Sequence, residues 1–255
     1  MYENKVSDGR ETAMSDTAPD AGYDYENRIP AGFYDKIYQR RTGVRFCWHD
    51  LKFRTVVAHL GTPRRLLDIG CGPGTFIGNY LPGVEALGVD LSGSQVDYAT
   101  RTYGSEAHRF STRSLASLAE SGERFDAVTV IELIEHLVPD DAVRLLAEAR
   151  SLLTPGGVLV VTTPNYRSLW PIIELGVNAL SPISYIEQHI NKYRRGLLAT
   201  HLSAAGYRDV TVGTAVGLAP FTAVFGLGTA SAIHAVETGV RYFGAGNLLV
   251  ATARP

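Results

Sequence analysis

The sequence predicts an α/β fold in which a mostly parallel sheet carries helices on both faces. Segments typical of strands alternate with segments typical of helices between residues 65 and 163. The first strand, Arg65–Ile69, runs directly into a glycine-rich turn, Gly70–Gly74. The composition, 45% hydrophobic and 20% charged over 255 residues, is that of an ordinary globular protein of one or two domains. Together these observations exclude fibrous, coiled-coil and wholly disordered proteins.

The alternation of elements can be followed from one residue range to the next. A helix is expected at Val44–Leu60, because apolar residues recur there at helical spacing and Gly61 ends the pattern. Five strands are expected after this helix, at Arg65–Ile69, Val84–Asp90, His108–Thr112, Phe125–Ile131 and Gly157–Thr163. Three helices are expected between these strands, at Gly74–Leu81, Ser92–Tyr103 and Asp140–Leu153. Pro139 suits the first turn of the last helix, where its missing N–H is not needed.

The C-terminal third contains two more helices and two more strands. The helices are expected at Ser168–Leu180 and Arg194–Ala205, and the strands at Tyr207–Val212 and Gly246–Ala253. Between these strands lie the eighteen residues Val216–Ile233, which carry no formal charge. Their length is near that of a membrane span, but a proline and three glycines interrupt them. We therefore expect a lid or a surface-docking element.

Charge is unevenly distributed along the chain. Residues 1–27 contain seven acids and two bases, a local charge of -5, so the other residues carry +3 of the total of -2. This segment has few large aliphatic residues and is predicted to be a disordered acidic tail, with Met14 as an alternative start to Met1. Residues 28–255 form the predicted domain. The near-neutral balance argues against a nucleic-acid partner. Two cysteines and no signal-peptide pattern favour a cytoplasmic location.

The glycine turn is flanked by two aspartates. Asp68 precedes Gly70 by two residues, and Asp90 follows it by twenty, at the end of the next strand. A dinucleotide site needs G-x-G-x-x-G, whereas this turn is one residue shorter. A carboxylate beside the turn would repel a pyrophosphate but suits an ammonium group. S-adenosylmethionine carries such a group and no phosphate, and Asp90 could accept hydrogen bonds from its ribose hydroxyls.

Four stretches of the chain resemble the class I S-adenosylmethionine-dependent methyltransferases. They are Leu67–Gly74, Gly88–Ser92, Phe125–Val128 and Pro155–Gly157. The resemblance implies a Rossmann-like three-layer sandwich with a seven-stranded sheet in the order 3-2-1-4-5-7-6 and an antiparallel last strand. It implies cofactor contacts from Asp68, Gly70, Cys71, Gly72 and Gly74 at the methionine part, from Asp90 at the ribose, from Leu91, Ser114 and Leu115 at the adenine, and from Ile131. Many members have an aspartate in place of Ser114.

Acidic and histidine side chains gather after the fourth predicted strand. If Glu132, Glu135 and His136 form a helical turn, they share one face, and His189 follows further along the chain. This arrangement resembles ubiquinone-biosynthesis O-methyltransferases most closely, and also small-RNA 2′-O-methyltransferases. In the RNA enzymes a Glu-x-x-Glu-His turn and a later histidine hold a metal. Oxygen-rich ligation would favour Mg²⁺ or Mn²⁺.

Two alternatives to metal binding remain open for these residues. Without a metal, His136 would be a general base, Glu132 a positioning group, and His189 part of the acceptor pocket. Purely structural packing is the other alternative.

Aromatic and apolar residues suggest where an acceptor binds. Tyr34, Tyr38, Trp48 and His49 belong to a predicted N-terminal helical cover, and Trp170 to an apolar stretch after the fifth strand. The same residues could instead pack on the core. We expect apolar lid insertions at 166–190 and 214–243 that enclose a hydrophobic small-molecule acceptor. They could equally contact a membrane surface or form a homodimer.

The predicted function is methyl transfer from S-adenosylmethionine to a hydroxyl oxygen of a small apolar or amphiphilic metabolite. A phenol, a quinol or a glycosylated natural product would fit, which suggests a role in secondary metabolism. A sugar N- or C-methyltransferase and a non-catalytic S-adenosylmethionine-binding protein are the alternatives.

Overall fold

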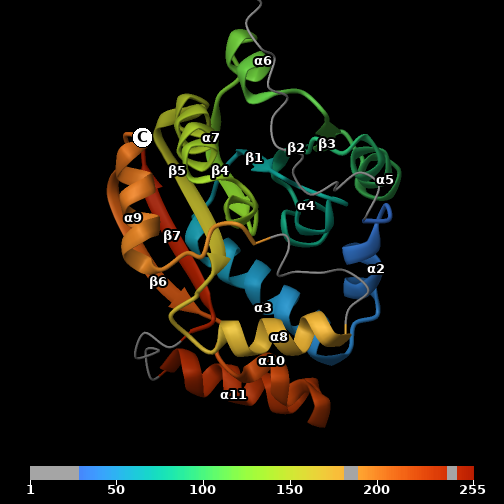
Figure 1. Cartoon of the computed structure of the whole chain (residues 1–255). Coiled ribbons are helices and arrows are strands. Elements are labelled where there is room, and N and C mark those ends of the chain that lie inside the picture. The colour runs from blue at the N-terminus through green and yellow to red at the C-terminus, as the bar shows by residue number, and fades with distance from the viewer. Residues whose placement is uncertain (1–28, 181–188, 240–245) are drawn as a thin grey trace, which may run out of the picture.

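Seven strands form one sheet in the order β3-β2-β1-β4-β5-β7-β6 (Figure 1). The computed structural model describes residues 29–180, 189–239 and 246–255, so the predicted acidic tail and both possible starts lie outside the described residues. The strands are β1 (Arg65–Ile69), β2 (Glu85–Val89), β3 (His108–Ser111), β4 (Phe125–Ile131), β5 (Leu153–Pro164), β6 (Arg208–Ala215) and β7 (Leu248–Arg254). Among the strands of the described residues, only β7 runs antiparallel to its neighbours, β5 and β6. The predicted fold class and strand order are confirmed.

Helices cover both faces of the sheet because successive strand residues point to opposite faces. Leu67 and the other strand residues that point to the same face pack against α6 (Leu115–Glu120), α7 (Pro139–Ser151) and α9 (Arg195–Ala204). Leu66 and the strand residues that point to the opposite face pack against α3 (Gly43–Leu60) and α4 (Thr75–Tyr80). Beside α4 lies α5 (Gly93–Tyr103), which also contacts β3. The two hydrophobic clusters fix the carboxyl ends of β1, β2 and β4 at one edge.

The N-terminal cover includes a helix that the sequence pattern did not reveal, α2 (Phe33–Gln39). Its Asp35 is buried and accepts hydrogen bonds from Thr75 Oγ1 at 2.9 Å, Tyr98 Oη at 2.9 Å and Tyr103 Oη at 2.6 Å. These contacts attach α2 to α4 and α5, the two helices that follow the glycine turn and Asp90.

The two predicted insertions form helices at the carboxyl edge of the sheet. α8 (Trp170–Leu180) lies in the first, and α10 (Ala219–Thr222), a 3₁₀ turn (Ala223–Phe225) and α11 (Leu227–Gly239) lie in the second (Figure 1). Residues 181–188 and 240–245 of these insertions are outside the described part of the chain. The uncharged stretch is thus broken into short helices. Among the described residues, no helix combines the length and the apolar character that a membrane crossing requires.

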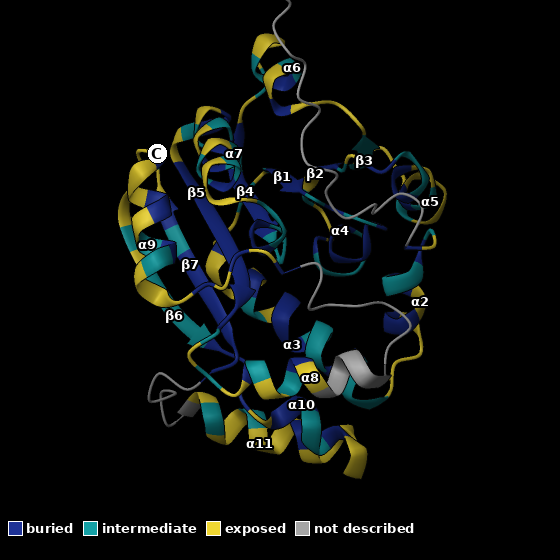
Figure 2. Ribbon diagram, in the orientation of Figure 1, coloured by how far each residue is buried: buried dark blue, intermediate teal, exposed yellow. Residues whose placement is uncertain are grey.

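Exposed residues occur along α8 and α11 (Figure 2), and large apolar residues on both insertions are exposed. On α8, Ile172 is 69% and Leu175 62% exposed, and on the second insertion Phe225 is 81% and Val236 62% exposed. A membrane surface and a second copy of the chain remain the two predicted partners for this face.

Candidate active site

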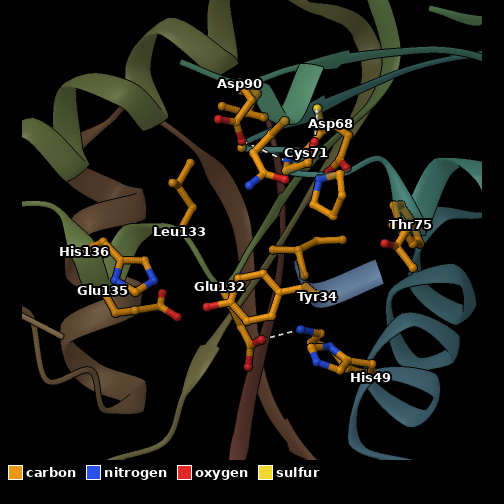
Figure 3. A pocket seen from close by; sticks show the side chains of 18 of the residues that line it. Tyr34, His49, Asp68, Cys71, Thr75, Asp90, Glu132, Leu133, Glu135 and His136 are labelled. Carbon is orange, nitrogen blue, oxygen red and sulfur yellow. Dashed lines mark hydrogen bonds and ion pairs between the residues drawn. The ribbon is translucent and has the colours of Figure 1, made fainter. Parts of the chain in front are cut away.

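A cavity of about 800 Å³ opens at the carboxyl edge of the sheet, where the strand order reverses between β1 and β4. Open α/β sheets bind ligands at this position, and the volume suits a small-molecule site. Apart from Gly74, all the residues predicted to form the site line it: Tyr34, Tyr38, Trp48, His49, Asp68, Gly70, Cys71, Gly72, Asp90, Leu91, Ser114, Leu115, Ile131, Glu132, Glu135, His136, Trp170 and His189. Asp68, Cys71 and Asp90 lie toward one end, and Glu135 and His136 away from them (Figure 3).

The glycine turn adopts backbone conformations that favour glycine. Gly70, Gly72 and Gly74 have φ angles of 73°, 50° and 76°. A Cβ on Gly74 would lie 2.8 Å from Phe110 and 2.9 Å from Ala99, so this glycine permits close packing, and it does not line the cavity. A Cβ on Gly72 would meet no described atom within 4 Å. The backbone at Gly72 therefore leaves room for a ligand.

The two aspartates beside the turn fit the two polar parts of S-adenosylmethionine. Asp68 is 2% exposed and accepts a hydrogen bond from Thr129 Oγ1 at 2.6 Å. Burial raises the pKa of Asp68 to about 7, and a bound ammonium group would favour its ionised form. Asp90 accepts hydrogen bonds from the backbone N–H of Gly72 at 2.8 Å and of Ser92 at 2.9 Å. Carboxylate oxygens accept more than one hydrogen bond, so Asp90 can also receive ribose hydroxyls.

The affinity for S-adenosylhomocysteine, which carries the same ammonium group, should rise with pH between about pH 6 and pH 8. Below the pKa of about 7, Asp68 is protonated and must lose its proton to pair with the ammonium. Each unit of pH below that value should weaken binding by up to about tenfold. Asp68→Asn should bind more weakly and show a flat profile over this range. Calorimetric titration checks both curves, and a parallel slope in the variant would contradict the role of Asp68.

Glu132 does not join the expected helical turn. Its backbone is left-handed, with φ 49°, and only Ile134–His136 form a 3₁₀ turn. Its carboxylate makes an ion pair with Lys52 of α3, whose side chain is 4% exposed. Burial raises the pKa of Glu132, but the charge of Lys52 outweighs this and holds the pKa below its usual value. The expectation that Glu132 shares a face with Glu135 and His136 is therefore wrong.

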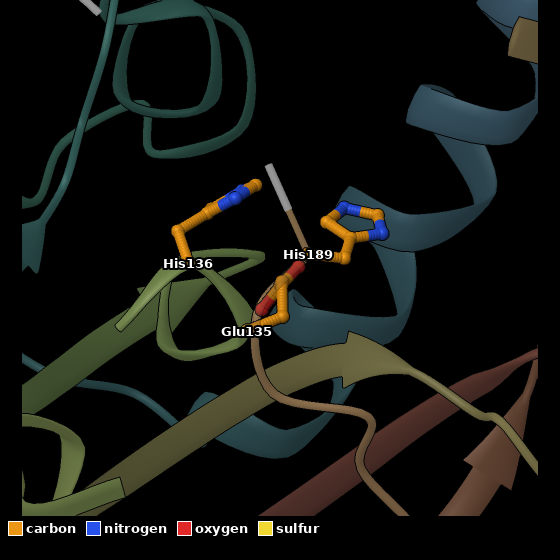
Figure 4. Close-up of side chains that lie close together, drawn as sticks. All are labelled: Glu135, His136 and His189. Carbon is orange, nitrogen blue, oxygen red and sulfur yellow. The ribbon is translucent and has the colours of Figure 1, made fainter. Parts of the chain in front are cut away.

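Glu135, His136 and His189 form the polar cluster of the cavity (Figure 4). One potential ligand atom from each residue lies within 4.8 Å of the others. Glu135 is fully buried and accepts a hydrogen bond from Thr163 Oγ1 at 3.0 Å, whereas its Oε1 atom has no hydrogen-bond partner among the described residues. Burial raises the pKa of Glu135 to about 7. An unsatisfied carboxylate oxygen beside two imidazoles suits a divalent cation or a protonated partner.

Two residues that follow β5 contact His189 through its Nδ1 atom. Its Nδ1 contacts Glu174 Oε1 of α8 and lies 2.9 Å from Tyr166 Oη. Burial lowers the pKa of His189, but the carboxylates of Glu174 and Glu135 outweigh this and raise it. A buried carboxylate therefore contacts this histidine on one side, an arrangement that is common for metal-ligating histidines.

Aromatic side chains form the remaining wall. Trp48 and Trp170 pack with ring centroids 5.0 Å apart, which joins α3 to α8. Burial and the charge of Lys52 lower the pKa of His49 to about 3, so this imidazole is neutral at physiological pH. The hydroxyl of Tyr38 is bonded to Tyr80 at 2.8 Å, on the core side of the helical cover.

Two site residues were missed by sequence reasoning. Lys52 lies one helical turn after His49, between the apolar Leu51 and Phe53, and a lysine in an apolar run is a signal for a buried ion pair. Glu174 is the only charged residue between Arg167 and Glu187. Both signals are visible in the sequence, but neither reveals the partner.

Comparison with known proteins identifies the family of the chain. Residues 38–212 match a family described as a methyltransferase domain, and this range includes both aspartates, the glycine turn and the polar cluster. The chain belongs to the methyltransferase-domain family. The resemblance seen in the sequence is therefore confirmed at the level of the family.

Curated relatives of this methyltransferase domain include ubiquinone biosynthesis O-methyltransferases. One from Alkalilimnicola ehrlichii is 40% identical over 107 residues, which cover 40% of this chain and 42% of the relative. One from Azorhizobium caulinodans is 33% identical over 142 residues, 54% of this chain and 52% of the relative. The domain thus matches only about two fifths to one half of the length of these relatives.

Solved structures support the fold of the methyltransferase domain. A SAM-dependent methyltransferase from Archaeoglobus fulgidus has a TM-score of 0.60 at 20% identity, covering 88% of this chain and 100% of that one. The plantazolicin methyltransferase BpumL in complex with SAH has a TM-score of 0.56 at 15% identity, covering 87% of this chain and 88% of that one.

Proposed function

We propose that this methyltransferase transfers a methyl group from S-adenosylmethionine to a hydroxyl oxygen of a small, largely apolar aromatic acceptor. The observation that carries the proposal is the polar cluster Glu135, His136 and His189, which lines the same cavity as the glycine turn and faces an aromatic wall. The curated relatives named as O-methyltransferases support transfer to oxygen.

The reaction needs few groups beyond correct placement of the two substrates. The S–CH₃ bond of the sulfonium breaks as the O–CH₃ bond forms, the hydroxyl proton passes to a base, and S-adenosylhomocysteine leaves. Asp68 and Asp90 orient the donor, while Trp48 and Trp170 hold the acceptor ring and exclude water. Such placement can contribute on the order of 7–11 kcal/mol. In the protein without a metal, His136 receives the proton.

A divalent cation held by Glu135, His136 and His189 is part of the proposal. The buried Oε1 of Glu135 without a hydrogen-bond partner supports it. A bound cation would lower the pKa of the acceptor hydroxyl. Because Glu132 is paired with Lys52, the donors are two imidazoles and one carboxylate, which favours Mn²⁺ or another transition metal over Mg²⁺.

Acceptor class is tested by incubating the full chain with S-adenosylmethionine and a panel of phenols, catechols, quinols, sugars and amines. Mass spectrometry and NMR of the products locate the new methyl group. We expect methyl ethers of the aromatic alcohols. N- or C-methylated sugars as the main products would contradict the proposal, and so would cofactor binding without any turnover.

Stringent chelation should slow methyl transfer strongly, because only His136 is then left to take the hydroxyl proton, and added Mn²⁺ should restore the rate more effectively than Mg²⁺. The donor set with two imidazoles is the reason for that order. Initial rates with each ion measure the effect. Binding of S-adenosylhomocysteine, followed in parallel, should stay unchanged, because Asp68 and Asp90 do not belong to the cluster. Full activity after chelation would rule out the cation and leave His136 as the base.

A further inference from the structure

We infer that Glu174 is a positioning residue that orients His189 and couples it to α8. The inference rests on the proposed function in one respect, namely that His189 acts at the acceptor hydroxyl. The sequence marks Glu174 as an isolated charge but does not reveal its partner, and Glu174 does not itself line the cavity.

Glu174 contacts His189 directly and is buried together with it. Its carboxylate Oε1 contacts Nδ1 of His189 and accepts a hydrogen bond from Tyr166 Oη at 2.7 Å. The exposed fractions are 6% for Glu174 and 7% for His189, so water does not compete for this contact. A carboxylate in an otherwise apolar stretch is costly to bury unless a partner compensates it. The geometry satisfies the carboxylate and fixes the rotation of the imidazole at the same time.

Fixing Nδ1 decides which nitrogen of His189 serves the cavity. With Nδ1 directed at Glu174, Nε2 points away from that carboxylate. The ring of His189 lies beside Glu135 and across from His136 (Figure 4). The two imidazole centroids are 5.1 Å apart. A carboxylate behind the ring also increases the basicity of the other nitrogen, whether that nitrogen takes a proton or holds a cation.

The same helix also forms part of the acceptor wall. Trp170 and Ile173 of α8 line the cavity, and Trp170 packs on Trp48 of α3. Glu174 comes directly after Ile173 on this helix. The packing of α8 against α3 therefore has two effects. It shapes the aromatic wall of the cavity, and it places the carboxylate of Glu174 next to His189. A change in how the acceptor contacts α8 should therefore affect kcat more than it affects the affinity for the methyl donor.

The test compares Glu174→Gln with the neighbouring control Leu175→Gln in the full chain. Leu175 is 62% exposed and does not line the cavity, so its variant controls for introducing an amide into α8. The first readout is the Nδ1–H proton resonance in protein labelled with ¹⁵N-histidine, assigned to His189 with His189→Asn. The others are Mn²⁺ affinity, S-adenosylhomocysteine affinity and kcat for any acceptor found in the panel.

Glu174→Gln should lose the downfield Nδ1–H resonance that a histidine–carboxylate hydrogen bond produces. Loss of an outer carboxylate partner typically costs about 10–100-fold, so Mn²⁺ affinity and kcat should fall by that factor. S-adenosylhomocysteine affinity should not change, and Leu175→Gln should match the wild type in every readout. An unchanged resonance in Glu174→Gln, or losses of the same size in Leu175→Gln, would overturn the inference.

Failure of the proposed function gives a different result. A wild-type chain that neither binds Mn²⁺ nor methylates any acceptor contradicts the proposed function. The resonance of His189 still decides whether Glu174 orients the ring in that case.

Discussion

Replacing both His136 and His189 by alanine is expected to lower kcat by about 10²–10⁴-fold, the usual contribution of a positioned acid or base. Both residues belong to the polar cluster. Binding of a cation requires both imidazoles, and proton transfer without a cation requires His136. Affinity for S-adenosylhomocysteine should be retained, because Asp68, Gly72 and Asp90 are untouched. Single-turnover rates and calorimetry separate the two effects.

The matched control for this double variant is His201→Ala. His201 is also buried but contacts Tyr193, away from the cavity lining. Turnover in the double variant equal to that of the control would remove the cluster from the mechanism. A loss of donor affinity parallel to the loss of kcat would instead indicate a collapsed cavity.

Lys52→Met is expected to lower the free energy of unfolding by about 3 kcal/mol, the lower end of the range for breaking a buried ion pair. Methionine leaves the carboxylate of Glu132 without its cation, while 20% of that side chain remains exposed and moderates the loss. Urea unfolding with linear extrapolation measures the change.

The double variant Lys52→Met with Glu132→Gln should recover most of the lost stability, because no uncompensated charge remains. Additive losses from the two substitutions would show that the ion pair contributes nothing specific. Arg54→Met is the control on the same helix, since Arg54 is 68% exposed and its pair with Asp50 lies at the surface.

The fold could be predicted because its signals are local. Gly70–Gly74, the apolar strands and the spacing to Asp90 each lie within a few residues or one βαβ unit, and each depends on backbone conformation or alternation. The short helix α2 was missed because its stability comes from Asp35, whose partners lie 40 to 68 residues away. Tertiary contacts of this kind leave no periodic pattern in the sequence.

In the candidate site, too, local features could be predicted from the sequence and long-range contacts could not. Apart from Gly74, the residues predicted for the cofactor end line the cavity, because they lie at or just after the carboxyl ends of neighbouring strands. The direction of Glu132 was not, because it depends on Lys52, 80 residues earlier in the chain. Gly74 was predicted to contact the cofactor, but it does not line the cavity, and a Cβ at this position would lie too close to Phe110 and Ala99. Spacing alone does not distinguish a glycine that faces a ligand from one that permits packing.

The central claim is that the cavity at the end of β1 is a site for S-adenosylmethionine. Calorimetric titration of the full chain with S-adenosylhomocysteine and, separately, with NADH tests it most directly. The structure predicts saturable binding of S-adenosylhomocysteine that is lost in Gly72→Val, whose side chain would occupy the open space beside the turn, and no binding of NADH. Binding of NADH in preference to S-adenosylhomocysteine would contradict the claim.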